Sequence, residues 1–504
     1  MTYKEKYDFL VSRLAEVVDL SRAAAVLAWD QQVNMPRGGM KARGDQLATL
    51  SSLAHARFTS PEIGELLQDL AAYERELPYE SDEASLIRVA RREYEKETKL
   101  PAKLVTELAK AANDGYAAWL QAREAKDYGV FRPALERIYR LMVEKAQALG
   151  YRERPLDAFV DESEPGMTIV DVEKLFSELK ETLVPLVAAI RERLDRVDDS
   201  VVLKYYDKDA QWKIGLEAVR AIGFDLDARG RQDLSVHPFT TSFSPDDVRI
   251  TTRLREREFT MGFFASLHEA GHGTYEQGLP KRLERTILCR GASGGLHESQ
   301  SRLWENIVGR SHEFWEFFYP TMQRYFPEQT SGVSLDSFYA AVNRVQPSFI
   351  RTEADEVTYN LHIMIRTELE KAVFDGQLAI ADLEQAWNDK YQEYLGIVPK
   401  DPVDGVLQDI HWSGGFGASF ISYTIGNIVM VQLFEAACRE IPNLKAGFAK
   451  GQFAPLLHWM NDHVHTHGAK FQPLELVRMA TGAELSARPY LDYIVTKFSA
   501  LYGL

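Results

Sequence analysis

Residues 264–272 read Phe-Ala-Ser-Leu-His-Glu-Ala-Gly-His. His268 and His272 are four positions apart, so on an α-helix their imidazoles lie one turn apart on one face and can bind the same ion. Glu269 lies beside that face, where its carboxylate can act as a general base on a water molecule. With 12 histidines in 504 residues, chance produces this pattern in roughly 0.02 of such chains. We therefore predict a helix here that carries a zinc site.

Two extended segments precede this helix. Residues 237–243 are followed by a Ser-Pro-Asp turn at 244–246, and then by residues 247–254. In this last segment Val, Ile, Thr and Leu occupy the even positions, while Asp, Arg, Thr and Arg occupy the odd ones. Such alternation places the two sets on opposite faces of a strand. We predict a β-hairpin, whose edge suits binding of an extended peptide.

The rest of the chain has helical periodicity. Apolar residues recur at intervals of three and four from position 9 to 18, and amphipathic stretches run over 81–100 and 172–197. The stretch 81–100 ends at the Leu100-Pro101 step, where proline disfavours further helix. We find no repeat, low-complexity tract or long linker. These patterns predict a mostly α protein.

A second candidate helix can supply the third metal ligand, since a catalytic zinc usually has three protein ligands. Residues 294–300 read Gly-Gly-Leu-His-Glu-Ser-Gln, and apolar residues follow at helical spacing. Glu298 is 26 residues beyond His272, enough chain to turn and return as a neighbouring helix. A carboxylate there would lower the net charge of the site. His297 is the rival ligand, and spacing alone does not exclude it.

Composition excludes several other classes of protein. The 504 residues carry a net charge of −15, which disfavours binding to nucleic acid or an anionic membrane. Two cysteines, Cys289 and Cys438, cannot form a disulfide framework and suit a reducing compartment. The most apolar stretch, 420–434, contains four polar residues and predicts a core helix rather than a membrane span. No signal-peptide pattern follows Met1. We expect a cytoplasmic protein.

Six short motifs follow one another in the second half of the chain: His237-Pro238-Phe239, Asp247-Val-Arg249-Ile-Thr251, His268-Glu269-Ala-Gly-His272, His297-Glu298-Ser299-Gln300, Ile350-Arg351-Thr352-Glu353-Ala354-Asp355 and Gly405-Val-Leu-Gln408-Asp409-Ile-His411-Trp412. Together they resemble the signature set of the thermostable carboxypeptidase Taq family of zinc metallocarboxypeptidases. The length of the chain also fits that family.

The resemblance implies Glu298 rather than His297 as the third ligand, and Glu269 as the base. It further implies one Zn²⁺ per chain, with Co²⁺ as a substitute, release of single C-terminal amino acids with broad specificity, little action on terminal proline, and a homodimer. We expect a large helical zincin-like body with a deep groove and a small β-sheet beside the metal helix. Because the motifs must converge on one ion, we expect a single domain, 1–504, with a helical lid at 1–230 and a catalytic lobe at 231–504.

A carboxypeptidase must bind a free α-carboxylate, which arginine does well through its bidentate fork. Arg351 and Asp355 are four apart on a predicted helix and would share a face. Arg249 is the competing clamp, and which arginine holds the carboxylate is open. The residues expected to line the substrate groove are His237, Asp247, Arg249, Thr251, Arg351, Asp355, Gln408 and Asp409.

Peptide hydrolysis builds negative charge on the carbonyl oxygen, so a preplaced donor is needed there. We predict His411, before a glycine-rich loop, or Tyr423 for this role, and we expect Gln408 and Asp409 to order the surroundings of the metal ligands. The histidine-rich stretch 462–468 instead predicts a helix ending at Gly468, without a second metal site.

Two other functions fit parts of these data. An endo-acting zinc oligopeptidase would share the metal site and lack the carboxylate clamp. A non-catalytic helical interaction protein would carry the histidine motif by accident.

Overall fold

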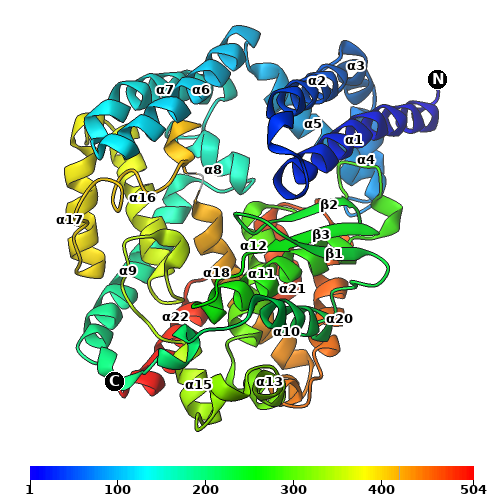
Figure 1. The fold of residues 1–504 in the computed structure, drawn as a ribbon. Helices are drawn as coiled ribbons and strands as arrows, with labels where there is room; N and C mark the ends of the chain where they lie inside the picture. The colour runs from blue at the N-terminus through cyan, green and yellow to red at the C-terminus, as the bar shows by residue number, and fades with distance from the viewer. Residues whose placement is uncertain (419) are drawn as a thin grey trace. The chain divides into compact units, whose positions relative to one another are not determined.

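The computed structural model describes residues 1–418 and 420–504, and it confirms a mostly α fold with one small sheet among these residues (Figure 1). The chain forms two compact units. Unit 1 consists of Met1–Thr98, Asp199–Val342 and Val429–Glu484, and unit 2 of Lys99–Asp198, Asn343–Ile428 and Leu485–Leu504. This division differs from the predicted lobes 1–230 and 231–504, whose roles as lid and catalytic lobe stay predictions.

Unit 1 contains the sheet and most of the shorter helices. Its helices are α1 (Tyr3–Val33), α2 (Met40–Phe58), α3 (Pro61–Asp69), α4 (Ala71–Glu76), α5 (Asp82–Lys99, ending just past the boundary), α10 (Lys208–Ala221), α11 (Phe259–Gly278), α12 (Gly294–Arg302), α13 (His312–Tyr325), α14 (Pro327–Thr330), α15 (Leu335–Val342), α19 (Leu444–Phe448), α20 (Ala454–His463) and α21 (Pro473–Thr481). A π-helical segment, η5 (Leu303–Val308), continues α12.

Unit 2 is helical throughout its regular elements. They are α6 (Ala102–Ala125), α7 (Tyr128–Leu149), α8 (Asp157–Ser163), α9 (Ile169–Arg191), α16 (Tyr359–Phe374), α17 (Leu383–Leu395) and α22 (Arg488–Tyr502), while α18 (Ile421–Glu440) begins in unit 2 and ends in unit 1. Short 3₁₀ turns complete the described chain: η1 (Arg37–Gly39), η2 (Leu194–Arg196), η3 (Ser200–Leu203), η4 (Lys281–Leu283), η6 (Arg351–Glu353), η7 (Ile380–Asp382), η8 (His411–Ser413) and η9 (His465–His467).

The sheet has the order β1-β3-β2. Strands β2 (Thr240–Ser244) and β3 (Asp247–Thr252) are antiparallel, with Thr240 opposite Ile250, which confirms the predicted hairpin. β1 (Gly230–Leu234) adds a parallel third strand that we did not predict, because its sequence Gly-Arg-Gln-Asp-Leu has no apolar alternation. Both β2 and β3 pack against α11, as Figure 1 shows.

Gly271 lets α12 approach α11 closely. A Cβ atom at this position would lie 2.6 Å from Cα of Ser301 and 2.7 Å from the carbonyl oxygen of Gln300, well inside van der Waals contact. α12 itself begins where the hydroxyl of Ser293 accepts a hydrogen bond from the amide of Leu296, a standard N-cap. The small residue inside the His-Glu-x-x-His motif thus allows the two candidate metal helices to touch.

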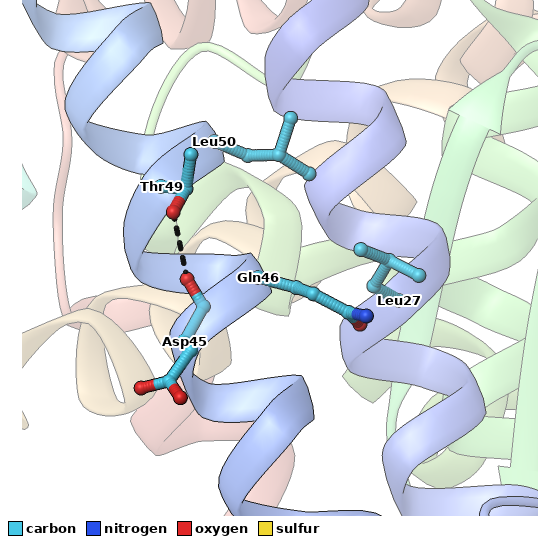
Figure 2. Close-up of a pocket in the computed structure, with 5 residues that line it drawn as sticks. All are labelled: Leu27, Asp45, Gln46, Thr49 and Leu50. Atoms are coloured by element: carbon cyan, nitrogen blue, oxygen red, sulfur yellow. Dashed lines mark hydrogen bonds between the residues drawn. The ribbon is translucent and has the colours of Figure 1, made fainter.

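Among the described residues, α18 is the one helix long and apolar enough to cross a membrane, but 72% of its most apolar stretch is buried within the protein. Such burial is typical of the core helix that the sequence predicts. α1 and α2 pack side by side in unit 1, with a hollow between them that is lined by Leu27, Asp45, Gln46, Thr49 and Leu50 (Figure 2). The bond drawn there joins the Thr49 hydroxyl to the carbonyl of Asp45 within α2, so it belongs to the helix itself.

Candidate metal centre

His268, His272 and Glu298 form the one group of three or more His, Cys, Asp and Glu side chains, among the described residues, whose possible ligand atoms converge. One such atom from each lies within 4.8 Å of the others. Oε2 of Glu298 is 3.8 Å from Nε2 of His268 and 3.5 Å from Nε2 of His272. Both imidazoles therefore direct Nε2 toward the same carboxylate oxygen, although their helix and that of Glu298 are separate elements.

This donor set fits a catalytic zinc ion, which commonly has two histidines and one glutamate. The other oxygen of Glu298, Oε1, accepts a hydrogen bond of 2.7 Å from Nε of Arg302, so one oxygen remains directed to the histidines. Burial would raise the pKa of Glu298, but Arg302 and the two histidines hold it well below its usual value. The carboxylate is thus ionised, as a metal ligand must be.

His297, the rival ligand, has both ring nitrogens engaged elsewhere. Its Nδ1 is 2.6 Å from Nδ1 of His272, and its Nε2 is 2.9 Å from Oε1 of Glu276. Burial, together with the His297 ring, lowers the pKa of His272 to about 4. The geometry therefore favours Glu298 as the third donor and places His297 behind His272.

Glu269 is held by the sheet. Its Oε2 accepts a hydrogen bond of 2.6 Å from the hydroxyl of Thr240 on β2, and burial raises the pKa of this carboxyl group. A raised pKa brings a carboxylate closer to the range in which it exchanges protons at neutral pH. The sequence did not single out Thr240, although it directly follows the His-Pro-Phe motif.

Glu305 lies behind His268. Its Oε2 is 2.9 Å from Nδ1 of His268 and 3.2 Å from Nη1 of Arg302. Burial would raise the pKa of Glu305, but Arg302 and His268 lower it to about 2. Burial would likewise lower the pKa of His268, but Glu298 and Glu305 outweigh burial and raise it. Glu305 lies in the π-helical segment, seven residues after Glu298; this spacing is the signal that could have pointed to it, but no motif contains Glu305 and we did not single it out.

The predicted strand residues are fixed within the sheet. The Arg249 guanidinium donates two hydrogen bonds of 2.9 Å to Asp247 and lies 4.3 Å from the ring centre of Trp29 on α1. The Thr251 hydroxyl accepts from the amide of Phe239, which ties the strand to the His-Pro-Phe segment. His237 lies in that segment, and its carbonyl accepts from Ser235. Asp247 thus occupies one edge of the Arg249 fork.

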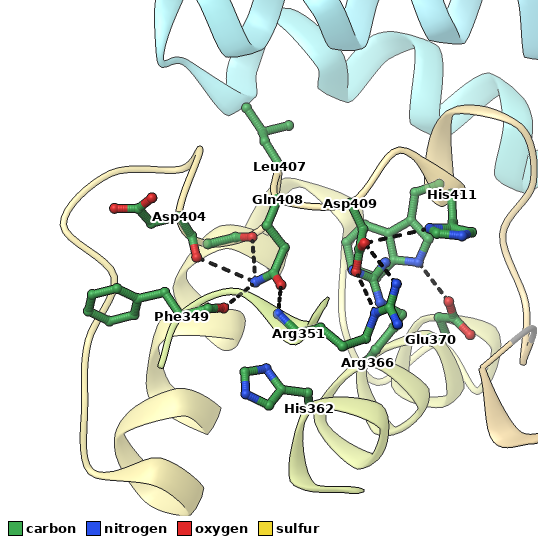
Figure 3. Close-up of polar contacts among 12 residues, drawn as sticks. Phe349, Arg351, His362, Arg366, Glu370, Asp404, Leu407, Gln408, Asp409 and His411 are labelled. Carbon is green, nitrogen blue, oxygen red and sulfur yellow. Dashed lines mark hydrogen bonds and ion pairs between the residues drawn. The ribbon is translucent and has the colours of Figure 1, made fainter. Parts of the chain in front are cut away.

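In unit 2, the guanidinium of Arg351 forms an ion pair with the carboxylate of Asp409 (Figure 3). Its Nε and Nη2 lie 3.1 and 3.2 Å from the two oxygens of Asp409, and Nη2 of Arg366 lies 2.9 Å from the same carboxylate. The two arginines hold the pKa of Asp409 below its usual range, against the effect of burial. Gln408 accepts from the backbone amide of Arg351. Gln408 and Asp409 therefore order the surroundings of Arg351.

The prediction that Arg351 and Asp355 share one face of a helix is wrong. Arg351 lies in the 3₁₀ turn η6 rather than in an α-helix, so a separation of four positions does not bring the two side chains to one face. Asp355 instead accepts from the amides of Gln346, Val357 and Thr358 and organises the start of α16.

His411 and Tyr423 also lie in unit 2. His411, in η8, has a side chain that is 42% exposed, with Nδ1 3.8 Å from Oδ1 of Asp409. The ring of Tyr423, on α18, lies 5.4 Å from the Arg351 guanidinium and 5.8 Å from the ring of Phe420. Their roles in catalysis stay predictions.

The histidine-rich stretch is structural. α20 ends at His463, five residues before the predicted end at Gly468, and a 3₁₀ turn covers His465–His467. His465 is buried and bonds to Asn461 and Gln300. Among the described residues, the stretch contributes to no converging group of metal donors.

Comparison with known proteins agrees with this geometry. A family profile described as "Carboxypeptidase Taq (M32) metallopeptidase" matches residues 9–498. The chain is 44% identical to thermostable carboxypeptidase 1 of Thermus thermophilus, covering 100% of both chains, and 38% identical to carboxypeptidase 1 of Bacillus subtilis, covering 100% of this chain and 99% of the relative. A crystal structure of a carboxypeptidase from Deinococcus radiodurans is similar, with a TM-score of 0.95, 41% identity, and coverage of 99% of this chain and 100% of that one.

Proposed function

Since this chain belongs to the carboxypeptidase Taq family of metallopeptidases, and is therefore a metallocarboxypeptidase that acts on peptides, we propose that it uses zinc to release single C-terminal residues with broad specificity. The observation that carries the choice of zinc is the group of His268, His272 and Glu298, whose donor atoms converge within 4.8 Å. Two imidazoles and one carboxylate suit zinc better than the all-oxygen sites preferred by Mg²⁺ or Ca²⁺. Co²⁺ is the proposed substitute, since it accepts a similar donor set.

His268, His272 and Glu298 would hold the ion. When bound, zinc supplies Lewis-acid chemistry, polarising a peptide carbonyl and making water more acidic. Glu298 stays ionised because Arg302 donates to its outer oxygen. The same hydrogen bond orients the carboxylate so that its other oxygen, Oε2, faces Nε2 of both histidines.

Glu269 is the proposed general base. It would accept a proton from the attacking water and pass it to the amine that leaves. The Thr240 hydroxyl donates to one of its oxygens at 2.6 Å, which fixes the carboxylate plane and leaves the other oxygen to take the proton. Burial of Glu269 favours this exchange, because it raises the pKa of the carboxyl group.

Substrate binding is proposed for both arginine-bearing motifs. Arg249 and Arg351 each have one edge of the guanidinium occupied by an aspartate, Asp247 and Asp409, so each presents a cation in a fixed orientation. Either can attract the terminal carboxylate with its remaining donors. His411 is the more exposed of the two candidate oxyanion donors, and Tyr423 is the alternative.

Timed mass analysis of one peptide, with a free or an amidated C-terminus, tests this function. We expect stepwise loss of single residues from the free peptide and no cleavage of the amide. Internal cleavage of both forms would favour the endo-acting oligopeptidase. Protein that binds no metal and cleaves neither form would favour the non-catalytic interaction protein.

Assembly and location complete the proposal. We propose a homodimer on the strength of the family resemblance, to be checked by light scattering during gel filtration. A cytoplasmic location suits the two cysteines, Cys289 and Cys438, which are both free. Cell fractionation with an antibody to the protein would test it.

A further inference from the structure

Each metal-facing histidine is backed by a buried carboxylate, but in two different ways. His268 contacts Glu305 directly, with 2.9 Å between Nδ1 and Oε2. His272 reaches Glu276 through an intervening ring, His297. All of these groups lie in unit 1, on α11, α12 and the π-helical segment that continues α12.

Glu305, the carboxylate that contacts His268 directly, is itself bound by two arginines. Nη1 of Arg302 lies 3.2 Å from Oε2 of Glu305, and Nη2 of Arg310 lies 3.5 Å from Oε1. An ionised carboxylate only accepts hydrogen bonds. The nitrogen of His268 that faces it must therefore carry the proton, which leaves Nε2 of the neutral ring with a free lone pair.

Glu276 fixes the proton position of His272 in the same way, through two successive hydrogen bonds that pass through His297. Oε1 of Glu276 accepts from Nε2 of His297, so a neutral His297 has no proton on Nδ1. That bare nitrogen is 2.6 Å from Nδ1 of His272, which must then donate. Nε2 of His272 is again left without a proton, and it is the nitrogen that lies 3.5 Å from Glu298.

We propose that Glu305, and Glu276 acting through His297, are positioning residues that fix the tautomers of His268 and His272, so that both rings offer Nε2 to a metal ion before it arrives. This inference rests on the proposed metal site. It assigns to His297 of the His-Glu-Ser-Gln motif the role of a proton-ordering link between a ligand and a carboxylate.

Replacing Glu305 or Glu276 by glutamine should disturb the hydrogen bonds that fix these tautomers. In E305Q one of the two carboxylate oxygens becomes an NH₂ group. Facing Nδ1 of His268, this group would donate and favour the opposite tautomer; facing Arg310, it would leave His268 only a neutral amide oxygen, shared with Arg302, as its acceptor. In E276Q the amide can donate to Nε2 of His297, which places a proton on Nδ1 against that of His272. The matched control is E356Q, since Glu356 is a glutamate with a 3% exposed side chain, paired with Lys497 and Tyr493 in unit 2.

The test uses the full chain with metal removed, labelled with ¹⁵N-histidine, and reads the tautomers by long-range ¹H–¹⁵N correlation. A chelator competition then gives the zinc dissociation constant. In the wild type we expect His268 and His272 protonated at Nδ1, and His297 protonated at Nε2. E305Q and E276Q should change these tautomers and weaken zinc binding by about 10- to 100-fold, with E356Q unchanged.

Neutral wild-type rings that carry their single proton at Nε2 of His268 or His272 would overturn the inference without any variant, even if a variant failed to fold. So would variants whose tautomers and zinc affinity match the wild type. A wild type that binds no zinc would contradict the proposed function instead, while the tautomers would still test this inference on their own.

Discussion

The metal group of unit 1 and the ion cluster of unit 2 are both largely shielded from solvent and both charged, yet they are built in opposite ways. In unit 1, one possible ligand atom from each of His268, His272 and Glu298 lies close to the others, and Arg302 contacts the oxygen of Glu298 that is turned away from the histidines. In unit 2, Asp409 lies directly against Arg351 and Arg366. The first group directs its donor atoms toward one point, as a metal site does, whereas the second pairs its carboxylate with arginines of the same chain.

This difference indicates which charged groups can bind a metal ion and which only stabilise the fold. Converging acceptors repel one another unless a cation joins them, so such a group is costly for the fold and suited to a metal. An aspartate between two arginines is already compensated, so it mainly fixes the chain around it. We therefore expect substitutions in unit 1 to change rate and metal binding, and substitutions at Asp409 to change stability.

The substitution expected to have the largest effect is Glu269→Gln in unit 1. The amide cannot accept a proton, so we expect kcat to fall on the order of 10³-fold, typical for loss of a general base. Zinc affinity should stay the same, because Glu269 is not among the three converging donors. Steady-state kinetics and metal analysis measure the two effects. Glu258→Gln, at the start of the same helix, is the control and should retain activity. Full activity in E269Q would remove Glu269 as the base.

The next effect is expected in unit 2, from Asp409→Asn. This change leaves two buried guanidinium groups without their carboxylate, which costs about 3–5 kcal/mol of unfolding free energy. Thermal and urea unfolding should detect it, while the zinc dissociation constant stays at the wild-type value. Asp401→Asn, in the exposed pair with Lys126, is the control and should change stability far less. Weakened zinc binding in D409N would show that the ion cluster is not separate from the metal group.

The pH dependence of the same variant sharpens this point. The pKa of Asp409 is lower in the folded chain than its usual value because Arg366 and Arg351 overcome the effect of burial. A depressed folded pKa gives stability that is present above the unfolded pKa of about 3.9 and is lost as the pH falls toward the folded value. The stability gap between wild type and D409N should therefore be constant near neutral pH and shrink below about pH 4. A gap that stays constant at low pH would mean that the charge of Asp409 is not its source.

Much of this architecture could be predicted from periodicity and motif spacing. The helix around His268, the hairpin before it and a second helix bearing Glu298 all occur where the sequence predicts them. These features are local, since they depend on side-chain period and on turn residues within one element. The residues expected to bind substrate stay predictions in their roles, although their positions are now defined.

The rest depends on contacts that sequence periodicity cannot express. Thr240 reaches Glu269 across a strand-to-helix contact, and Glu305 reaches His268 on a different helix, from the π-helical segment that continues α12. β1 is polar and is recruited by pairing with β3 rather than by its own pattern. The wrong prediction of a shared helix face for Arg351 and Asp355 has a similar origin, because Arg351 lies in a 3₁₀ turn and not in the helix that the spacing argument assumed.

Gly271→Ala in unit 1 should have a smaller effect, which combines a loss of stability with a loss of zinc affinity. The new Cβ would lie 2.6 Å from Cα of Ser301, so α12 must move away from α11. We expect a loss of about 1–3 kcal/mol in stability, typical of overpacking. Zinc affinity should fall as well, because Glu298 moves with α12. Gly44→Ala in α2, where no atom lies within 4 Å of the added Cβ, is the control and should cost nothing. Destabilisation with unchanged zinc affinity would mean that the position of α12 does not set the third ligand.

Thr240→Val should have the smallest effect and isolates what the sheet contributes to the metal group. Valine keeps the shape of threonine and removes the hydroxyl that donates to Glu269, a loss of about 1 kcal/mol. We expect kcat to fall about five-fold, with KM and zinc affinity unchanged, because only the orientation of the base is altered. Thr241→Val, the next residue on β2, is directed to the opposite face of the strand and should leave kcat unchanged. Equal losses in both variants would mean that the strand acts through general stability, and the sheet would then be a support for α11 rather than part of the catalytic geometry.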